Sequence, residues 1–487
     1  MKFLVVGGGS GGHITPAVAV VREILEQSPR SKVEFWTDKK YYKNVVKITT
    51  ELGVRWGSRA GASTRTVPYI RVRKISAGKF RRYSGWTPIQ WIRNWWIVIK
   101  DLIFGNIIGF FQFVIGLHQS FWRLLPKSKR PDVIFLKGGF VGLPVGIVAK
   151  HFGIPYVIHE SDAVPGLANR VLMKHAAVIA TGWKEESSTN QQKPEQDQPV
   201  CNSSITQIDE IVNRGDGSPV RIFTGIPVAV EFRTVSRTQQ NALKKSFGFD
   251  PERPLVVVTG GSQGAENINE AMRKILPEML ELASVGLVAG RKHYESMVEL
   301  KRYEDWNRAK LQSNFRLWEF NSAMHELLGA ADIVISRAGA TTIAELAALE
   351  KATILVPFEA LPNSHQLRNA EDFAKAGAVV MIKDSAMRAD PRSLLAEVRH
   401  LIRAPKERST LAQKLHREAA PDAAARLAVV LLQIARQSEK GGVAKPKHRV
   451  GCVTKNSIKK TATVRPTRQQ KRLRKVEKQK THIREID

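Results

Sequence analysis

A histidine follows the first glycine-rich turn of the chain, at a position where it can act as a general base. The N-terminus reads KFLVVGGGSGGHITPAV, so Gly7, Gly9 and Gly12 have the G-x-G-x-x-G spacing of nucleotide-binding turns. His13 comes next, and an imidazole there can accept a proton near neutral pH. The same spacing, with Asp38 where a ribose-binding acid would stand, leaves an NAD(P)- or FAD-dependent enzyme open. A capping or packing role is the alternative for the histidine.

Polar residues also follow two later strand-like runs of the N-terminal half. Gly138 and Gly139 come after VIFLK and open a turn. His159, Glu160 and Asp162 come after PYVI, and parallel α/β sheets bind their ligands at the carboxyl ends of strands. The His-Glu pair has no further ligand at a spacing such as HExxH, so the sequence predicts no metal site. A helix cap is the alternative role for Asp162.

A second group of candidates lies in the C-terminal half, beyond another glycine-rich turn, VVVTGGSQG. The string SRAGATTIAELAAL ends a predicted strand and begins a predicted helix, with Thr341, Thr342 and Glu345 on its first turns. Thr341 and Glu345 are four residues apart and share one helix face. A carboxylate there can accept hydrogen bonds from both ribose hydroxyls, while the helix N-terminus faces a diphosphate. A capping role is the alternative for Glu345. His365 and Gln366 follow in a polar loop that can bind sugar hydroxyls.

Alternating strand and helix signals position these candidates. Residues 1–180 and 229–420 each repeat a short β-branched run followed by an amphipathic stretch, which predicts parallel sheets in two Rossmann-like domains. We place the first domain at 1–228 and the second at 229–436, where the apolar helix DAAARLAVVLLQIARQ closes it. Residues 437–487 have no hydrophobic period and are expected to be a disordered basic tail. We therefore expect an α/β protein whose two domains face each other across a cleft.

Two segments interrupt the first domain. Residues 86–130 hold an aromatic-rich stretch whose central part, LIFGNIIGFFQFVIGLHQSFW, has no charged residue and is flanked by lysines and arginines. Its asparagine, glutamines, histidine and serine argue against a membrane span, so one or two interfacial helices are expected. A buried pair of core helices is the alternative. Residues 184–218 are polar and are expected to be a disordered insertion.

The net charge points to an anionic partner. The chain carries a formal charge of +31, of which residues 440–487 contribute +13 through sixteen Lys and Arg against three Asp and Glu. The tail has no aromatic residue, which excludes base stacking there but allows non-specific binding of nucleic acid or another polyanion. Cys201 and Cys452 are the only cysteines, so no disulfide framework is expected. Glycines stand where a signal peptide would have its apolar core, and a cytosolic enzyme is expected.

Five ordered strings resemble the MurG family of bacterial peptidoglycan transferases: GGGSGGHITPAVAV, KGGFVGLPVG, VIHESDAVPGLANR, TGGSQGAENIN and SRAGATTIAELAAL. The resemblance implies a GT-B fold and inverting transfer of GlcNAc from UDP-GlcNAc, held by the C-terminal half. It implies that the acceptor, held by the N-terminal half, is lipid I (undecaprenyl-diphosphoryl-MurNAc-pentapeptide), which becomes lipid II. No cofactor or catalytic metal is implied. The enzyme would be peripheral on the cytoplasmic face of the cell membrane, against anionic lipids. A related transferase from a UDP-hexose to diacylglycerol is the alternative.

The resemblance also assigns roles residue by residue, with His13 at the position of the proposed general base. The donor-binding positions are Ser262, Gln263, Gly264, Arg337, Gly339, Thr341, Thr342, Glu345, His365 and Gln366. The acceptor- and diphosphate-binding positions are Gly9, Ser10, Gly11, Gly12, Gly138, Gly139, His159, Glu160, Asp162 and Asn169. Three residues depart from the family pattern: Asp162 stands where many members have Asn, Phe140 replaces a common Tyr, and Ala229 replaces the usual Arg of the interdomain motif. The basic tail has no counterpart in the pattern.

Overall fold

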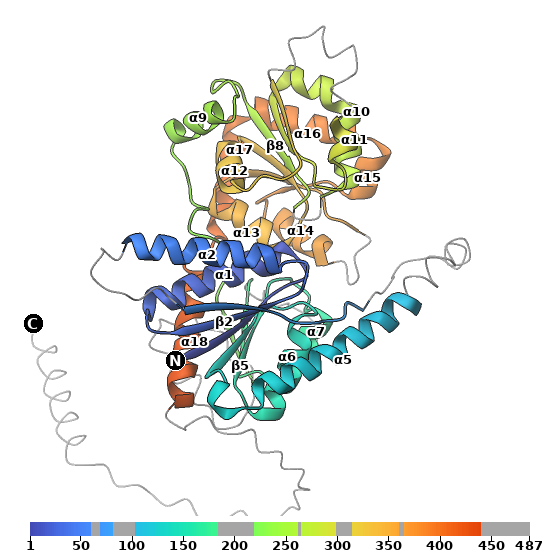
Figure 1. The fold of residues 1–487 in the computed structure, drawn as a ribbon. Helices are drawn as coiled ribbons and strands as arrows, with labels where there is room; N and C mark the ends of the chain where they lie inside the picture. Colours follow the sequence, from blue (N-terminus) through green and yellow to red (C-terminus); the bar gives the residue numbers. More distant parts are fainter. Residues whose placement is uncertain are drawn as a thin grey trace, which may run out of the picture. The chain divides into compact units, whose positions relative to one another are not determined.

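The structure, a computed structural model, describes residues 1–59, 69–80, 103–183, 219–261, 264–298, 314–359 and 365–439 (Figure 1). The predicted insertion at 184–218, the tail at 440–487 and two donor-binding candidates, Ser262 and Gln263, lie outside these residues. Of the aromatic segment, the part from Ile103 onward is described. The described residues form two parallel sheets with helices packed against them (Figure 1).

The first sheet has seven parallel strands in the order β3-β2-β1-β4-β5-β6-β7. Its central strands are buried along their whole length, as in β4 and β5. Parallel strands covered on both faces need such continuous apolar runs, which is why β-branched and aromatic residues dominate them. The strands are β1 (Lys2–Val6), β2 (Lys32–Thr37), β3 (Tyr69–Lys74), β4 (Val133–Leu136), β5 (Tyr156–Glu160), β6 (Val178–Thr181) and β7 (Val220–Phe223).

Helices connect these strands and cover the sheet. α6 shows how the sequence ends one of them: the helix stops at Gly153, whose φ of 66° is a left-handed conformation that favours glycine. The helices of this half are α1 (Gly11–Gln27), α2 (Tyr42–Arg59), α5 (Gly105–Leu124), the 3-10 turn η3 (Lys127–Lys129), α6 (Gly142–Phe152) and α7 (Leu167–Met173).

The second sheet has six parallel strands in the order β10-β9-β8-β11-β12-β13. The strands are β8 (Leu255–Thr259), β9 (Ser284–Val288), β10 (Phe315–Trp318), β11 (Ile333–Ser336), β12 (Ala352–Leu355) and β13 (Val380–Met381). The helices are α9 (Arg237–Ser246), α10 (Glu266–Leu282), α11 (Tyr294–Val298), α12 (Met324–Ala330), α13 (Ala340–Ala348), α14 (His365–Lys375), α15 (Asp384–Ala389), α16 (Arg392–Arg403) and α17 (Pro405–Arg417).

Each sheet has a switch point beside a glycine-rich turn. In the first sheet β1 lies between β2 and β4, and in the second β8 lies between β9 and β11. At such points the chain leaves neighbouring strands in opposite directions, which opens a crevice at their carboxyl ends. The turns after β1, β4, β8 and β11 hold most of the candidate residues. The prediction of two Rossmann-like domains is confirmed.

The last helix, α18 (Ala423–Glu439), packs on the first sheet rather than on the second (Figure 1). Leu427, Leu431 and Ile434 are buried in one core cluster with Val5 and Ile24. The sequence placed this helix at the end of the second domain. An amphipathic pattern indicates that one face is buried, but it does not identify the surface that covers that face. The chain therefore passes between the two halves twice.

The two passages touch each other. The first follows β7, where Gly225 has a φ of 80°. The second leads from α17 to α18, and a Cβ on Gly225 would lie 2.2 Å from the Cβ of Ala420 there. The left-handed φ and the close approach both require glycine at this position. The exact boundary between the domains, placed at residue 228, stays a prediction.

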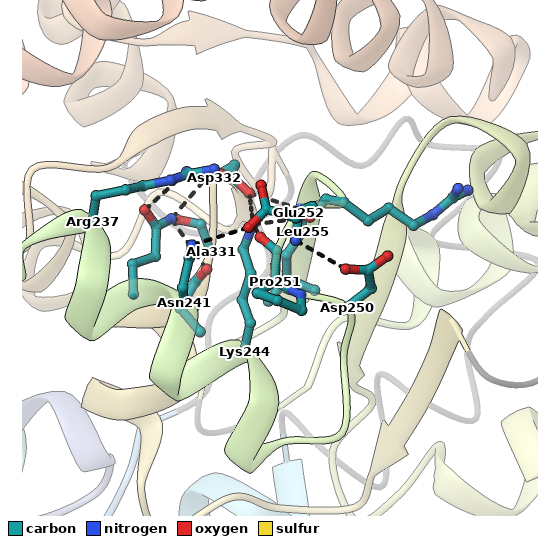
Figure 2. Close-up of polar contacts among 12 residues, drawn as sticks. Arg237, Asn241, Lys244, Asp250, Pro251, Glu252, Leu255, Ala331 and Asp332 are labelled. Carbon is teal, nitrogen blue, oxygen red and sulfur yellow. Dashed lines mark hydrogen bonds and ion pairs between the residues drawn. The ribbon is translucent and has the colours of Figure 1, made fainter.

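A buried ion pair lies where β8 and β11 begin, at the end of the second sheet opposite to the carboxyl ends of its strands (Figure 2). Nζ of Lys244 lies 2.6 Å from Oδ2 of Asp332, and that oxygen also accepts the backbone N–H of Leu255 at 2.9 Å. Nζ donates to the carbonyl oxygens of Pro251 and Arg253 as well. Burial acts to raise the pKa of Asp332, but its bonds to Lys244 and Leu255 hold that pKa below its ordinary value. The hydrogen-bonding groups of Lys244 and Asp332 are thus paired within the protein. We conclude that this ion pair has a structural role and fixes the starts of β8 and β11.

Candidate active site

The first glycine-rich turn, between β1 and α1, brings the base candidate against the second turn. Gly9 has a φ of 81°, and a Cβ on it would lie 2.6 Å from the ring of Phe140. A Cβ on Gly7 would lie 2.8 Å from the carbonyl oxygen of His13. Both positions therefore require glycine, and the shape of the turn follows from the sequence.

The ring of His13 has one nitrogen bonded to the protein and one that meets no partner among the described residues. Nδ1 lies 2.9 Å from the carbonyl oxygen of Gly8 and 3.1 Å from Oγ of Ser10. Because a carbonyl oxygen only accepts, Nδ1 carries the proton and Nε2 keeps its lone pair. Burial, followed by the charge of Lys137, lowers the pKa of His13 to about 4. The imidazole is therefore neutral at physiological pH, and Nε2 can accept a proton.

The turn after β4 packs against this ring. Gly138 and Gly139 have φ values of 98° and 76°, so both positions favour glycine. A Cβ on Gly139 would lie 3.0 Å from the ring of His13, and one on Gly138 would lie 3.2 Å from Nδ2 of Asn169. The second turn thus separates the base candidate from the residues that follow β5.

Lys137, directly before this turn, is a residue that the sequence reasoning missed. Its side chain is 1% exposed, and Nζ donates a hydrogen bond to Oγ of Ser161. Burial lowers the pKa of Lys137 to about 8, while Glu160 and Asp162 act in the opposite direction. A signal existed, because a lysine that directly continues a buried central strand has little water around it.

His159, at the end of β5, is bonded entirely within the protein. Its side chain is fully buried, with Nε2 2.9 Å from the carbonyl oxygen of Gly225 and Nδ1 3.3 Å from Oγ of Ser161. Burial, and then the charge of Lys137, keeps the pKa of His159 well below its ordinary value. Both ring nitrogens are used, so the geometry favours a structural role for His159 over the predicted acceptor contact.

Glu160 organises the loop that follows β5. Its carboxylate accepts the backbone N–H groups of Asp162 and Gly166, both at 3.2 Å, and Nδ2 of Asn169 at 2.8 Å. Burial raises its pKa above the ordinary value. Asp162, on this loop, accepts a hydrogen bond from Nδ2 of Asn369 on α14 at 3.3 Å. Acceptor contacts at Glu160, Asp162 and Asn169 stay predictions.

In the C-terminal half, the start of α13 carries the central donor-binding candidates. Gly339 precedes the helix, and Thr342 lies in its first turn. Oγ1 of Thr341 donates to the carbonyl oxygen of Gly12 at 3.1 Å, so α13 contacts the first glycine turn. Glu345 is partly buried, and its carboxyl group has no hydrogen-bond partner in the parts of the chain that are described. Burial raises its pKa to about 8.

Two further donor-binding candidates, Arg337 and Gln366, form hydrogen bonds with other residues of the C-terminal half. Arg337 is buried, and its Nη1 donates to Asp384 and to the carbonyl oxygen of Val356. Oε1 of Gln366 accepts the backbone N–H of Phe358 at 3.0 Å. A role in donor binding stays a prediction for both. The remaining described candidates are Gly264, which ends the turn after β8 with a φ of 75°, and His365, the first residue of α14.

These elements bring together groups suited to one kind of chemistry. They are a neutral imidazole with one nitrogen that no described residue bonds, two glycine turns beside the N-terminus of α1, and a carboxyl group on α13 that likewise has no partner in the described chain. The N-terminus of α1 attracts anions such as phosphates. Within residues 1–59, 69–80 and the later described ranges, no three His, Cys, Asp or Glu side chains are grouped to hold a metal ion. The arrangement suits transfer of a group from a nucleotide-linked donor to a hydroxyl.

A separate apolar surface, the α5 face, is formed by Ile103, Phe104, Ile107, Ile108, Phe110, Phe111, Val114, Ile115, Trp122 and Leu125, all exposed. The opposite side of the helix is held close to the protein by small residues. A Cβ on Gly116 would lie 2.1 Å from the carbonyl oxygen of Ser76. Lys79, Lys127 and Lys129 are exposed near its two ends. In the described part, no helix is long and apolar enough to cross a membrane. The alternative of a buried helix pair does not hold for α5.

Family models match both halves of the chain. The glycosyltransferase family 28 N-terminal domain matches residues 97–181, and the C-terminal domain of that family matches residues 255–427. Among solved structures, the chain is similar to Acinetobacter baumannii MurG, with a TM-score of 0.55 and 21% identity over 89% of this chain and 99% of that one. The glycosyltransferase of kitacinnamycin gives a TM-score of 0.53 at 16% identity, over 89% and 99%. Both structures support the GT-B fold.

Curated relatives are more similar in sequence. A protein of Lachnospira eligens is 30% identical over 402 residues, which cover 82% of this chain and 90% of the relative. A protein of Thermoanaerobacter sp. (strain X514) is 29% identical over 427 residues, 88% of this chain and 98% of the relative. Both are named UDP-N-acetylglucosamine–N-acetylmuramyl-(pentapeptide) pyrophosphoryl-undecaprenol N-acetylglucosamine transferase.

Proposed function

Because the chain belongs to the MurG family of UDP-GlcNAc-dependent N-acetylglucosaminyltransferases, we propose that the groups around His13 perform the family's transfer reaction. The enzyme moves GlcNAc from UDP-GlcNAc to lipid I and forms lipid II in peptidoglycan biosynthesis. A UDP-hexose:diacylglycerol transferase is not favoured, because the curated relatives carry the peptidoglycan activity in their names. We assign a separate role in the reaction to the imidazole of His13, to the carboxyl group of Glu345 and to the pair of glycine turns.

The observation that carries the mechanism is that Nε2 of His13 has no partner among the residues the structure describes. We assign His13 as the general base, since Nδ1 is held by the carbonyl oxygen of Gly8 and Nε2 is left as acceptor. Nε2 takes the proton of the acceptor's sugar hydroxyl while that oxygen forms a bond to the anomeric carbon of GlcNAc. The bond between this carbon and the diphosphate oxygen breaks, and its electron pair leaves with UDP. Attack opposite to the leaving group inverts the anomeric configuration.

Glu345 is the residue we assign to the donor's ribose. Its carboxyl group has no hydrogen-bond partner among residues 314–359 or the other described ranges, and such a buried acceptor is costly unless a ligand supplies donors. Two ribose hydroxyls supply them. The N-terminus of α13, two turns earlier in the chain at Gly339, faces the diphosphate and stabilises the charge that develops on it.

The glycine turns after β1 and β4 are the proposed site of the acceptor's diphosphate. Residues 7–12 end at the N-terminus of α1, where backbone N–H groups and the helix dipole favour anions. A side chain is excluded at Gly9 by the ring of Phe140 and at Gly139 by the ring of His13, so these glycines let the two turns pack closely around His13. This placement would put the acceptor's sugar hydroxyl near His13.

We further propose that the enzyme works at the cytoplasmic face of the cell membrane, with the α5 face in the lipid surface. The α5 face offers large apolar side chains, and exposed lysines at its ends attract anionic lipid. The acceptor is itself a lipid, which fits such an orientation. The basic tail adds charge without aromatic residues, and non-specific binding of lipid or nucleic acid is its proposed property.

A donor-panel assay tests the assignment. Purified enzyme is supplied with lipid I in detergent and with radiolabelled UDP-GlcNAc, UDP-glucose, UDP-galactose or UDP-GalNAc, with and without EDTA. We expect lipid II from UDP-GlcNAc at a rate that EDTA leaves unchanged. Faster transfer from another sugar nucleotide, transfer to diacylglycerol in preference to lipid I, or loss of activity with EDTA would contradict the proposal.

A further inference from the structure

Asn369 is a buried asparagine of the C-terminal half that the proposed mechanism does not use. It lies on α14, one turn after the donor-binding candidates His365 and Gln366. Its side chain is 2% exposed. A buried amide needs hydrogen-bond partners, because an unpaired polar atom in the interior costs free energy. The partners of Asn369 therefore show what its side chain does.

Three hydrogen bonds fix the orientation of this amide. Oδ1 accepts the backbone N–H of Ala163 at 3.1 Å. Nδ2 donates to Oδ1 of Asp162 and to the carbonyl oxygen of Ala338, both at 3.3 Å. Because the N–H of Ala163 only donates and the carbonyl oxygen of Ala338 only accepts, the two ends of the amide cannot be interchanged. Both the oxygen and the nitrogen of Asn369 are thus engaged by the protein.

These partners belong to both halves of the chain. Ala338 lies in the turn between β11 and α13, between the donor-binding candidates Arg337 and Gly339. Asp162 and Ala163 lie in the loop after β5, 207 and 206 residues before the asparagine. A single side chain therefore joins two elements of the half to which we assign the donor with the loop to which we assign acceptor contacts.

The loop after β5 is held from two sides. Within its own half, the carboxylate of Glu160 accepts the backbone N–H groups of Asp162 and Gly166. Among the described residues, the N–H of Ala163 is bonded by Asn369 instead. The side chain of Ala163 is exposed, so packing does little to hold this part of the loop. The bond from the other half is what fixes it.

α14 contacts the N-terminal half at a second point. Phe373, four residues after Asn369, lies on the same face of the helix and is buried. The centroid of its ring is 4.9 Å from that of Trp183, which follows β6, and the two rings are at 76°. An apolar contact of this kind has little directional preference, whereas hydrogen bonds have a defined geometry. The amide of Asn369 can therefore set how the helix is aligned with the loop.

We propose that Asn369 is a positioning residue that acts across the two halves: it aligns the loop after β5 with α14, so that the acceptor loop and the first turn of the donor helix keep a fixed spacing. Asn369 does not need to touch either substrate. Its consequence for catalysis rests on the proposed function, which assigns the loop to the acceptor and α14 to the donor. Its effect on the loop is measurable without substrate.

Amide hydrogen exchange in the full-length enzyme, free of substrate, tests the contact. Exchange is followed at the single amides of Ala163 and Gly166. We expect Asn369→Ala to speed exchange at Ala163 by about tenfold, the effect of removing one hydrogen bond that holds the loop closed. Exchange at Gly166 should change much less, because its N–H is bonded within the N-terminal half.

Asn269→Ala is the matched control. Asn269 on α10 is also a buried asparagine of the C-terminal half, and its Nδ2 donates to the carbonyl oxygen of Ala289 in that half at 3.0 Å. Its removal disturbs the second domain in a similar way without removing a bond to the loop. Exchange at Ala163 should stay at the wild-type rate in this variant.

Exchanging the two side chains distinguishes a contact between the halves from a role of Asn369 within its own half. Asn369→Asp places a carboxylate opposite that of Asp162, and their repulsion should speed exchange at Ala163. Adding Asp162→Asn restores the bond in the opposite direction, because the new amide donates to the new carboxylate, and exchange should slow again. The bond to Ala338 is lost in both variants, so the recovery reports the contact between the halves.

Steady-state kinetics with lipid I measures the consequence for catalysis. In Asn369→Ala, kcat/KM for lipid I at saturating UDP-GlcNAc should fall by about tenfold. The KM for UDP-GlcNAc should change less, although Asn369 belongs to the half to which we assign the donor. A role confined to the C-terminal half would give the opposite result, with the KM for UDP-GlcNAc changed most.

Asp162→Ala tests the contact from the loop and leaves the C-terminal half intact. It should also speed exchange at Ala163, and it replaces the Asn369 variants if those do not fold. Unchanged exchange at Ala163 in these variants, or no recovery in the double variant, overturns the proposal. Faster exchange with an unchanged kcat/KM for lipid I overturns the positioning role in catalysis. If the wild-type enzyme forms no lipid II from UDP-GlcNAc, the proposed function fails, and the exchange rates still decide whether Asn369 holds the loop.

Discussion

His13 and Glu345 share a property that their neighbours lack. Each is partly buried and presents an atom that no described group of the protein bonds: Nε2 of the imidazole and the carboxyl oxygens. His159 and Glu160 are also buried, but their polar atoms are bonded to the surrounding chain. Bonded side chains hold the loops in place, and we assign the two without a partner in the described chain to substrate.

Replacing His13 with alanine should lower kcat by about 100- to 10,000-fold, the range that a positioned general base contributes. The KM for UDP-GlcNAc should change little, because His13 lies in the acceptor half. Steady-state kinetics with lipid I and varied UDP-GlcNAc measures both constants. A variant with near-normal turnover would show that His13 has a structural role.

Donor binding should depend on pH through Glu345. Burial raises its pKa to about 8, so below pH 8 the free enzyme holds this carboxyl mostly protonated. The carboxylate accepts two ribose hydroxyls better than the acid does. The KM for UDP-GlcNAc should therefore fall about tenfold between pH 7 and pH 9, as the ionised fraction grows.

Glu345→Gln is the control for that prediction, since it keeps the shape and cannot ionise. Its KM should be higher and independent of pH over the same range, with kcat little changed. If the wild-type KM is flat between pH 7 and pH 9, the proposed contact of the carboxylate with ribose is wrong.

The sequence located the reactive residues better than it located their partners. The glycine spacing around His13 and the position of Glu345 on a helix start are local patterns, and both led to candidates. The bond between Arg337 and Asp384 joins residues far apart in the chain, and no local pattern indicates it. Lys137 was missed because lysines are rarely buried, so its type argued against a place in the core.

At the scale of elements, α5 packs on the protein with one side and exposes large apolar side chains on the other. Gly109, Gly116, Ser120 and Leu124 form the buried side of α5, and its small residues let the backbone approach residues 76–79. The exposed apolar side chains of the helix form the α5 face. The sequence predicted an interfacial helix here because the segment combines apolar residues with flanking charge. It could not predict which side would be buried, since three of the four buried residues are glycine or serine while many large apolar residues are exposed.

Substituting serine for Ile107, Ile108, Phe110 and Phe111 should release the enzyme from vesicles. These side chains are exposed, so the change removes apolar area from the α5 face and leaves the buried side of the helix intact. Vesicle flotation measures binding, and the KM for UDP-GlcNAc in detergent should stay the same. A folded variant that still floats would show that α5 is not the anchor, and an unfolded one would place these residues in a core.

At the scale of the whole molecule, α18 joins the end of the described chain to its beginning. Its buried leucines and isoleucine complete the core beneath β1 and α1. The parallel order of both sheets followed from the alternation of strand and helix signals. The return of α18 to the first sheet did not, because the helix pattern does not specify its partner surface.

Leu431→Ala in α18 should destabilise the first domain by about 2–5 kcal/mol, the usual cost of emptying a buried leucine site. The second sheet does not share that core, so urea unfolding followed by tryptophan fluorescence should show one transition moved and one retained. An equal shift of both transitions would show that the two halves unfold as one unit.

Deleting residues 440–487 should leave this stability unchanged and weaken binding to anionic vesicles alone. The segment contributes a formal charge of +13 and few apolar residues, so its attraction should be strongest at low salt. Flotation with anionic and neutral vesicles at two salt concentrations tests this. Equal loss of binding to both kinds of vesicle would contradict the charge argument.

Because Gly225 lies against Ala420, the half to which we assign the donor is connected to the rest of the chain at two neighbouring points. Such a domain can be exchanged without breaking the other half. The chain enters and leaves the donor half at neighbouring points, as an inserted domain does, while the acceptor half is completed by segments from both sides of the insertion. A recombination event with ends near these two residues could replace the half to which we assign the sugar nucleotide and retain the half to which we assign the lipid acceptor. The same geometry offers a design route: joining residue 224 to residue 421 through a short linker should yield the acceptor domain as an independent protein.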